Sequence, residues 1–373
     1  DPLRPIVVIA IGAGVFLYGL WRLLNALLEP FPARREPLVE LVYQKRSLAR
    51  GPRVVAIGGG TGQSTLLRGL KEISSNITAV VTVADDGGSS GKLRQELGVP
   101  PVGDIRNCIA ALADAEPARG SLMQYRFPAS EAEPGVAGHA LGNLLIAAMA
   151  DITGDFEEGV RGANRVLAVR GQVVPVAGEA LNLSAELADG TTLQGQSRIG
   201  RSRGIRRVWL SPASIEASHE AVEAIGSADL IVLGPGSLYT SLLPSLLVPG
   251  IRAALEQASG LRVYVANVAT QLGETEGYTL SEHVAALSAH DVGHLVDVVL
   301  ANDDTTARVP SGYPAEPVRI DLPSNDARPR LEMAAVVDPD NAHRHDPQRL
   351  TQALLRLLDE RPTARPVSPV RTA

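Results

Sequence analysis

The 373-residue sequence is poor in cysteine, in lysine and in aromatic residues, which make up only 3% of the chain. Cys108 is the only cysteine, so no intrachain disulfide can form, and zinc sites built from several thiolates are excluded. A single cysteine fits a reducing compartment. The net charge is -6 and the pI is about 5.7, so the chain lacks the broad basic surface of a nucleic-acid-binding protein.

Several catalytic motifs are also absent. The sequence has no G-x-S-x-G nucleophile elbow, no H-E-x-x-H pair and no cysteine next to a histidine. These absences leave no basis for a serine hydrolase of that type or a zinc protease. What remains is a chain with 45% hydrophobic residues, long enough for one large domain or two small ones.

The N-terminal segment differs from the rest of the chain. Residues 5–21 carry no charge, and after Arg22 the apolar residues continue to Leu28. A helix over these residues would be ~36 Å long, which exceeds the ~30 Å hydrocarbon core of a bilayer. A signal peptide or a buried helix is the alternative, but signal h-regions usually span ~7–15 residues. We predict a membrane anchor over residues 1–28.

The region after the anchor sets the expected topology. Residues 29–52 form a basic, proline-containing juxtamembrane linker, and its basic residues outnumber the single Arg4 before the uncharged run that begins at Pro5. The positive-inside rule then predicts a single-pass protein of the cell membrane whose C-terminal domain lies in the cytoplasm.

Residues 53–360 have the pattern of one doubly wound, Rossmann-like α/β domain. Apolar runs alternate with helical patterns, and near-continuous Val/Ile runs are typical of parallel strands covered on both faces. The expected strands are residues 53–57, 77–84, 229–233, 261–268 and 296–302, and the expected helices are residues 63–73, 104–114, 142–153, 278–290 and 346–360.

Two regions depart from this alternation. Residues 172–211 contain two alternating runs around Asp189-Gly190, which predicts a hairpin in a small antiparallel β insertion. Residues 361–373 are proline-rich, and we expect a disordered tail.

The first glycine loop follows the strand at 53–57 and reads Gly58-Gly59-Gly60-Thr61-Gly62. A strand, a glycine turn and a helix start form an anion site, because glycine lets the backbone approach closely and free helix N–H groups point at a phosphate. The alternative is merely a tight turn. Gln63 stands at the third position of the dinucleotide fingerprint and no Gly-Lys-Ser/Thr follows, so neither NAD nor a Walker-type nucleotide is indicated.

A second glycine loop repeats this arrangement. The apolar run at 229–233 leads into Gly234-Pro235-Gly236-Ser237 and a hydroxyl-rich helix start. Ligands of doubly wound sheets bind at the carboxyl ends of the strands. Two such loops therefore predict a diphosphate or two anionic groups, with Gly59, Gly60, Thr61, Gly62, Gly234, Gly236 and Ser237 as ligand-binding residues.

Adjacent carboxylates follow the strand at 77–84. Asp85 and Asp86 precede Gly87-Gly88 and the hydroxyls of Ser89 and Ser90, which are candidate ligand-binding residues. We predict that one acid binds sugar hydroxyls and the other binds Mg²⁺ beside the phosphates, since hard cations prefer carboxylate and phosphate oxygens. The plainer alternative is that Asp85 caps a turn and Asp86 is solvated.

Further polar residues stand at helix starts on the same predicted edge. Asp104 heads a helix and Asn107 follows one turn later, so both are candidates, although an N-cap would explain Asp104 fully. Asn143 begins an apolar helix after His139. Asn143 is a candidate ligand, and a capping asparagine with a surface histidine is the alternative.

The C-terminal half adds a last group of candidates. Asn267 ends the strand at 261–268, where it, Thr270 or Gln271 is placed to contact a base or sugar. Glu274 is a weaker candidate. Arg344 lies just before the last helix, whose predicted N-cap is Asp346. From spacing alone, a contact between Arg344 and a phosphate is the minor alternative, and a local role is the main one. His345 also has a local role as its plainer interpretation.

Taken in order, these segments resemble the bacterial gluconeogenesis-factor family, a branch of the group typified by 2-phospho-lactate transferase of deazaflavin cofactor synthesis. The resemblance covers roughly residues 53–360 and is carried by VVAIGGGTGQSTLLRGL, ITAVVTVADDGGSSGKLR, PPVGDIRNCIAALAD, GNLLIAA, LIVLGPGSLYTSLLPSLLVPGI, VANVATQLGETEGYT and RHDP. HALGN is the loosest match. The anchor is a departure, because many members of the family are soluble.

The resemblance implies a Rossmann-like, cytoplasmic domain that binds UDP-sugars such as UDP-N-acetylglucosamine. It implies a role in cell shape and in growth on gluconeogenic carbon sources. The family's sugar-nucleotide contacts match Thr61 in GGGTG and Arg344 in RHDP. The transferase relatives use a metal and the paired acids.

Two functions are therefore expected. The first is a membrane-tethered regulator that binds a UDP-sugar and acts on unidentified envelope-synthesis proteins, with no nucleic acid, NAD or zinc and with a homodimer left open. The second is a Mg²⁺-dependent transferase that moves a phospho-organic acid from a nucleotide to a hydroxyl, with Asp85 or Asp86 as catalytic residues.

Overall fold

A computed structural model describes residues 12–15, 18–19, 22, 38–113, 116–128, 135–310, 312, 315–322 and 329–361. Residues Asp1–Ser47 and Leu48–Ala373 form two compact units, and helix α2 (Leu38–Ala49) begins in the first. Most of the predicted anchor and nearly all of the predicted tail lie outside the described residues. Within the described part of the chain, no single helix is long and apolar enough to cross a membrane, although the bent pair Leu238–Leu246 and Pro249–Gln257 meets the length and composition criteria together.

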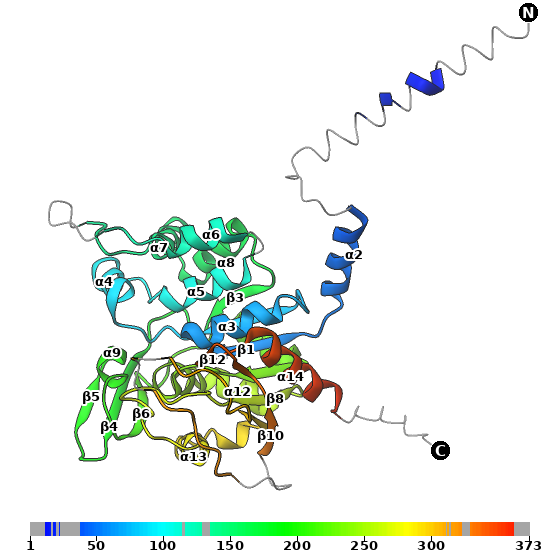
Figure 1. Ribbon diagram of the computed structural model, residues 1–373. Coiled ribbons are helices and arrows are strands. Elements are labelled where there is room, and N and C mark those ends of the chain that lie inside the picture. The colour runs from blue at the N-terminus through cyan, green and yellow to red at the C-terminus, as the bar shows by residue number, and fades with distance from the viewer. Residues whose placement is uncertain are drawn as a thin grey trace, which may run out of the picture. The chain divides into compact units, whose positions relative to one another are not determined.

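A seven-stranded sheet forms the centre of the second unit (Figure 1). All its neighbouring strands pair in parallel. In spatial order the strands are β10 (Arg330–Ala334), β9 (Val298–Asn302), β8 (Leu261–Val265), β7 (Leu230–Leu233), β1 (Val54–Gly58), β2 (Ile77–Val81) and β3 (Gln172–Pro175). The expected α/β fold with a mostly parallel sheet is confirmed.

Helices cover both faces of this sheet, which explains why its central strands read as unbroken apolar runs. Every residue of β1, β2 and β7 is buried. Both α5 and α10 contact β2 and β3, α3 packs against α5 and α14, and α10 packs against α12. The helices are α3 (Gly60–Leu70), α4 (Gly88–Leu97), α5 (Gly103–Leu112), α6 (Glu116–Gln124), α7 (Leu141–Thr153), α8 (Phe156–Val166), α10 (His219–Ser227), α11 (Leu243–Leu246), α12 (Pro249–Gln257), α13 (Leu280–Ala289) and α14 (Pro347–Asp359), with a π-helical turn η1 (Leu238–Leu242) and a 3-10 turn η2 (Gly293–Leu295).

The strand order places a topological switch point between β1 and β7. From β1 the chain proceeds outward through β2 to β3, and it then returns to β7 and proceeds outward on the other side through β8 and β9 to β10. Crevices at such a point, beyond the carboxyl ends of the strands, are the usual ligand sites of doubly wound sheets. Both glycine loops begin there.

The predicted antiparallel insertion is present but starts later than expected. Its sheet comprises β4 (Asn182–Leu187), β5 (Thr192–Gln194) and β6 (Ile205–Ser211), with the short helix α9 (Gln196–Ile199) between β5 and β6. The β4–β5 hairpin turns at Asp189-Gly190, where the Asp189 carboxylate accepts the Thr191 amide at 2.9 Å. Gln172–Pro175, which the sequence analysis placed in the insertion, is instead the parallel edge strand β3, because its apolar residues are buried beside β2.

The C-terminal segment returns to the switch point. A two-stranded antiparallel sheet pairs β11 (Val337–Asp338) with β12 (Asn341–His345) and leads into α14. The Asp346 carboxylate accepts the Gln348 and Arg349 amides at 2.9 and 2.8 Å, which confirms Asp346 as the N-cap of that helix.

Candidate ligand site at the switch point

The two glycine loops touch each other, backbone to backbone. A Cβ atom on Gly62 would lie 2.6 Å from the Pro235 carbonyl oxygen, and one on Gly236 would lie 3.0 Å from the Gly59 carbonyl oxygen. Real Cβ atoms essentially never approach as closely as the first of these distances, so the loops meet only because glycine stands there. The predicted convergence of the two loops is therefore found in the structure.

A cavity of about 770 Å³ opens beside this junction, and we call it the main cavity. Its volume falls within the ~300–1,000 Å³ typical of small-molecule sites. The predicted ligand-binding residues that line it are Gly59, Gly60, Thr61, Gly62, Asn107, Gly236, Ser237, Asn267, Gln271 and Arg344. Polar residues that the sequence analysis did not select also line it: Ser64, Thr65, Arg68, Gln124, Asn341 and His343.

The described charged residues that line the main cavity are all positive. Arg68 and Arg344 line it and are exposed, whereas no aspartate or glutamate occurs among its lining residues in the described part of the chain. His345 adds no charge, because burial lowers its pKa to about 4. In a chain of net charge -6, this lining favours an anionic ligand.

The N-terminus of α3 faces the main cavity through the first glycine loop. Gly60 has φ +69, a conformation that L side chains rarely adopt. No side chain of the N-cap residue, Gly59, closes the helix end, and the first turn contains no acidic residue. The amide groups of this turn lack helix partners, and those that Asp104 does not bond offer donors to an anion.

One acid stands immediately behind this loop. The Asp104 carboxylate accepts a hydrogen bond from the Gly60 amide. Burial and, to a smaller extent, the charge of Asp85 raise the pKa of Asp104 to about 6, against the opposing effects of Gly60 and Arg106. The N-cap alternative for Asp104 is wrong, since Asp104 lies inside the first turn of α5 and Val102 is the N-cap.

The two adjacent acids separate. Asp85 stays on the side of Asp104, where its carboxylate accepts the Gly87 amide at 2.9 Å and bonds with Ser90, and burial raises its pKa. Asp86 does not line the main cavity. Its carboxylate accepts the Ser197 amide of the insertion at 2.8 Å, and it lines a different cavity.

This separation corrects the expected use of the pair. Consecutive side chains beyond a strand end diverge, and the insertion captures the second of them. The expectation that one acid binds sugar hydroxyls and the other Mg²⁺ of the same ligand does not fit this geometry, because Asp86 lines a different cavity. Among the described residues, moreover, no group of three or more His, Cys, Asp or Glu side chains could hold a metal ion.

Four other predicted ligand residues do not line the main cavity: Ser89, Ser90, Asn143 and Gly234. The Ser89 hydroxyl accepts Asn143 Nδ2 at 2.9 Å and lies 3.1 Å from His139 Nδ1. All three side chains are buried, so His139 is not the surface histidine of the alternative. They link α4 to α7 and support the site from behind.

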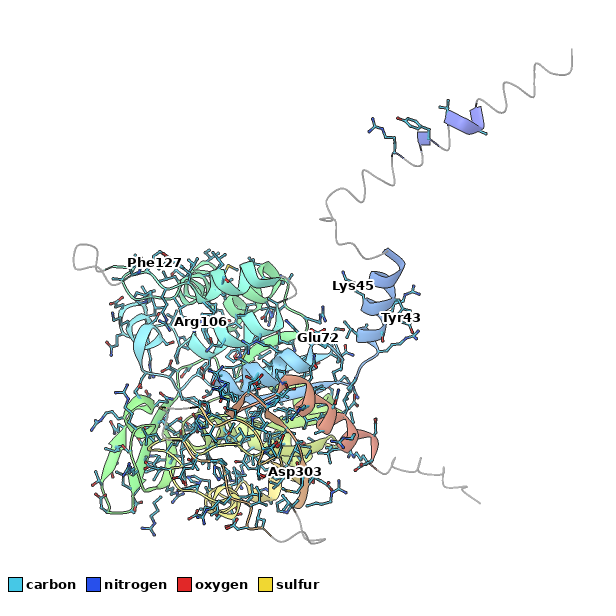
Figure 2. All side chains as sticks on the ribbon, in the orientation of Figure 1. Tyr43, Lys45, Glu72, Arg106, Phe127 and Asp303 are labelled. Carbon is cyan, nitrogen blue, oxygen red and sulfur yellow. The ribbon has the colours of Figure 1, made fainter. Side chains whose placement is uncertain are left out.

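Helix α5 presents Asn107 in a defined orientation. The buried Arg106 donates from Nη2 to Asn107 Oδ1 at 2.9 Å, and Gln124 Nε2 donates to the same oxygen at 3.0 Å; Figure 2 labels Arg106 on this helix. A guanidinium can only donate, so the amide oxygen must face it. The Asn107 NH₂ group is thereby left as a donor for an acceptor atom of a ligand.

The second glycine loop is held by side chains from the segment after β8. Asn267 accepts the Gly236 amide at 3.1 Å and donates to the Gly236 carbonyl at 2.9 Å, while Gln271 Nε2 donates to the Ser237 hydroxyl at 3.0 Å. Asn267, predicted to contact a base or sugar, thus has both amide atoms engaged by the loop. The Thr270 hydroxyl is likewise occupied, by the Glu316 amide at 3.1 Å.

Glu274 has a larger role than the sequence indicated. Its buried carboxylate accepts the Tyr239 and Thr240 amides at 2.6 and 2.8 Å, and so closes the N-terminus of η1. Burial raises the pKa of Glu274 to about 7, against these hydrogen bonds. A carboxylate of the protein therefore occupies the helix end that the second loop was predicted to offer to a phosphate.

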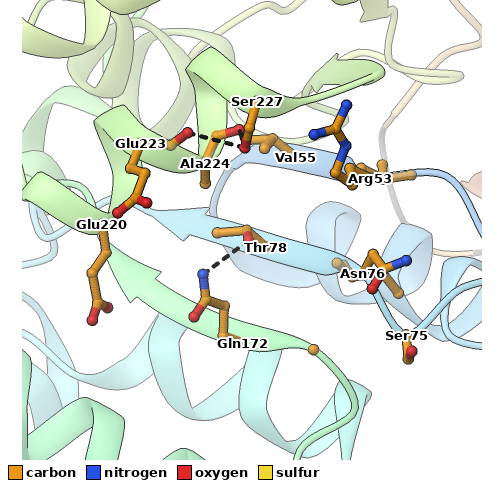
Figure 3. Close-up of a pocket in the computed structure, with 13 residues that line it drawn as sticks. Arg53, Val55, Ser75, Asn76, Thr78, Gln172, Glu220, Glu223, Ala224 and Ser227 are labelled. Carbon is orange, nitrogen blue, oxygen red and sulfur yellow. Dashed lines mark hydrogen bonds between the residues drawn. The ribbon is translucent and has the colours of Figure 1, made fainter. Parts of the chain in front are cut away.

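A third cavity, of about 470 Å³, lies at the opposite edge of the sheet (Figure 3). The starts of β1, β2 and β3 and one side of α10 line it. Gln172 Nε2 donates to the Thr78 hydroxyl at 3.1 Å across its floor. None of the predicted site residues lines it.

The fold and the main cavity define a doubly wound α/β protein with an arginine-lined cavity at its switch point. Residues 54–338 match the family model described as 2-phospho-L-lactate transferase CofD. The gluconeogenesis factor of Halalkalibacterium halodurans is 46% identical over 309 residues, which cover 81% of this chain and 95% of that protein. The gluconeogenesis factor of Bacillus subtilis is 44% identical over 321 residues, which cover 84% and 100%.

The solved structures agree. A crystal structure of a UPF0052-family protein from Bacillus halodurans superimposes with a TM-score of 0.74 at 43% identity, covering 82% of this chain and 99% of that one. The chain belongs to the gluconeogenesis factor family. The resemblance inferred from its motifs is confirmed.

Proposed function

We propose that this protein binds a UDP-sugar of the UDP-N-acetylglucosamine type in the main cavity. One observation carries the proposal: the cavity has arginines and an open helix N-terminus but no carboxylate among its described lining residues. The amides of the first glycine loop and Thr61 would hold the diphosphate, Arg344 would close over it, and the Asn107 NH₂ group would meet an acceptor atom of the ligand. The volume of about 770 Å³ accommodates a nucleotide sugar.

Calorimetric titration with UDP-N-acetylglucosamine tests the proposal. A charge-assisted hydrogen bond contributes ~1.5–3 kcal/mol, so Arg344→Ala should weaken binding ~10- to 100-fold. Arg356→Ala is the matched control, because Arg356 is exposed on α14 and does not line the cavity. Equal affinities for the wild type and Arg344→Ala would remove Arg344 from the site, and no binding of any UDP-sugar would overturn the proposal.

We further propose that ligand binding regulates cell-envelope synthesis during gluconeogenic growth. The similarity to gluconeogenesis factors supports a role in gluconeogenic growth, and the envelope role is what the motif resemblance implies. A strain that lacks its own factor should regain normal cell shape with the wild-type gene and with Arg356→Ala. It should not regain normal shape with Arg344→Ala. The membrane anchor, the cytoplasmic placement and the protein partners stay predictions.

A transferase is the second candidate function, favoured by the matching family model and by the raised pKa of Asp104, about 6, beside the first glycine loop. A carboxyl group with such a pKa could take a proton from an acceptor hydroxyl. Incubation with a nucleotide-activated phospho-organic acid, Mg²⁺ and a deazaflavin acceptor should then release nucleotide, and Asp104→Asn should abolish the release. Tight binding without turnover favours the regulator.

A further inference from the structure

The cavity that Asp86 lines is a distinct feature of the fold, and we call it the insertion cavity. It has a volume of about 270 Å³ and lies between the end of β2, helix α4 and the antiparallel insertion. Figure 1 shows α4 close to α9 in this region. The insertion cavity and the main cavity share no lining residue.

The lining of the insertion cavity is mostly polar and carries one charge of each sign. Its polar side chains include Asp86, Arg94, Asn182, Ser184, Gln194 and Gln196. Asp86 and Arg94 are both partly buried. Within the described part of the chain, neither has a partner of opposite charge: Asp86 is bonded to the Ser197 amide, and Arg94 donates to the Asn182 side-chain oxygen.

These neutral partners fix both charged groups without neutralising them. The Ser197 amide uses Asp86 Oδ1 at 2.8 Å and leaves Oδ2 for another donor. Arg94 uses only Nη2 on Asn182, so its other N–H groups are available. A ligand that carries both charges would form a charge-assisted hydrogen bond with each group.

A glycine keeps the space at Asp86 open. Gly195 has φ +96, and a Cβ atom there would lie 2.3 Å from Asp86 Oδ2. Any other residue would press on the very oxygen that is left free. The insertion therefore approaches Asp86 closely with a backbone that carries no side chain at this point.

We propose that the insertion cavity binds a small zwitterion, with its carboxylate or phosphate on Arg94 and its ammonium group on Asp86. The volume of about 270 Å³ suits a molecule of amino-acid size and is far below that of the main cavity. The amide and hydroxyl side chains around the two charges supply hydrogen bonds for a polar body. An α-amino acid and an amino-alcohol phosphate are the two sources of this chemistry.

The position of Asp86 connects such a site to the first glycine loop. Its chain neighbour Asp85 belongs to the group around Asp104 and the first glycine loop. A ligand on Asp86 thus acts on the turn that carries Asp85. The proposal does not depend on the identity of the ligand in the main cavity.

Thermal unfolding of the full chain with millimolar amounts of each common α-amino acid, and of phosphoethanolamine, tests the proposal. At least one compound should raise the midpoint in a saturable manner, and the responding class identifies the anionic group. Arg94→Gln and Asp86→Asn should each weaken that binding at least ~10-fold, since each removes a charge-assisted contact. Asp86→Asn keeps an oxygen for the Ser197 amide, so it preserves the fold contact while removing the charge.

Arg198→Gln is the matched control, because Arg198 is an exposed arginine of α9 that does not line the insertion cavity. It should bind the compound like the wild type. Two results would overturn the proposal: no saturable shift with any compound, or a shift that Arg94→Gln and Asp86→Asn both leave unchanged. Either result would make Arg94 and Asp86 structural links between α4, the β2 end and the insertion. A normal UDP-sugar titration of each variant separates loss of this site from misfolding.

Discussion

The first glycine loop, Gly58–Gly62, and the second, Gly234–Ser237, each follow a central parallel strand and precede a helical turn. The two loops differ in whether a side chain of the protein already accepts the amides of the helical turn that follows. In the first turn of α3 the Asp104 carboxylate accepts one amide, that of Gly60, and the N-cap residue supplies no side-chain bond, whereas the Glu274 carboxylate closes the η1 turn on two amides. The same pattern of residues thus leaves amides available at the helix start of the first loop, whereas the protein's own carboxylate bonds the amides at the helix start of the second loop.

This difference assigns separate roles to the two loops. A phosphate at the first loop would meet the amides that Asp104 does not bond, but at the second loop it would have to displace a buried carboxylate. The second loop instead supplies the surface against which Gly62 packs, and Asn267 and Gln271 hold that surface in place. We infer that the first loop binds the ligand and the second loop supports it.

A substitution that forces the two loops apart should have the largest effect on UDP-sugar affinity. A Gly62→Ala Cβ atom would lie 2.6 Å from the Pro235 carbonyl oxygen, so the loops must move apart. We expect UDP-sugar affinity to fall more than ~100-fold and the free energy of unfolding to drop ~1–3 kcal/mol, as for an overpacked contact. Titration calorimetry and urea unfolding measure the two effects.

Gly226→Ala is the control for that substitution. Gly226 lies in α10, and nothing stands within 4 Å of an added Cβ atom. Helix propensity predicts a stabilisation of about 0.5–1 kcal/mol and no change in affinity. Wild-type binding by Gly62→Ala would show that the junction of the loops does not shape the site.

Removing the carboxylate of the second loop should have the next largest effect. Glu274→Ala leaves the buried Tyr239 and Thr240 amides without their acceptor. We expect a loss of ~2–4 kcal/mol in the free energy of unfolding and weaker UDP-sugar binding. If the second loop bound phosphate directly, the same variant would bind the ligand more tightly, and the assigned roles would be reversed.

Glu274→Gln sharpens this test, because it keeps an acceptor oxygen and removes the charge. Burial raises the pKa of Glu274 from 4.5 to about 7. The folded state then binds more protons than the unfolded state between these values, so the free energy of unfolding falls as pH rises through that range. Denaturant titrations at several pH values should show a smaller fall in Glu274→Gln, and an unchanged slope would contradict the raised pKa.

Local sequence patterns were enough to predict the strands that carry the two loops and the glycines of the loops themselves. Buried Val/Ile runs marked β1, β2, β7, β8 and β9, and glycines marked both loops. Strand β10 was missed, because its residues are mostly half-exposed and lack an apolar run. The location of the site at the switch point also followed, since parallel strands end at one edge.

The residues that decide what each loop does were beyond local patterns. Asp86 is bonded to Ser197, 111 positions along the chain, and Glu274 reaches back 35 positions to Tyr239. Motif spacing in the sequence does not predict contacts between residues so far apart in the chain. Arg106 and Gln124 were missed for the same reason, because their effect on Asn107 depends on how α5 and α6 pack.

The acid behind the first loop should produce the smallest and most specific effect. Protonation of Asp104, whose pKa burial raises to about 6, removes a negative charge beside an anionic ligand. UDP-sugar affinity should therefore rise about fivefold as pH falls from about 7.5 to about 5.5, as expected for one charge at moderate screening. By linkage, binding at neutral pH should take up protons, which calorimetry in buffers of different ionisation enthalpy measures.

Asp104→Asn separates this effect from other titrations near the loop. Asparagine keeps an oxygen for the Gly60 amide, so the variant should bind at pH 7.5 about as tightly as the wild type binds at low pH, with little further pH dependence. Asp85 and Arg106 also face Asp104, and Glu274 titrates near the same range, so the measurement belongs in a Glu274→Gln background. A full pH slope that persists in the double variant would mean that Asp104 does not set the charge behind the first loop, and the contrast between an open and an occupied helix end would then rest on Glu274 alone.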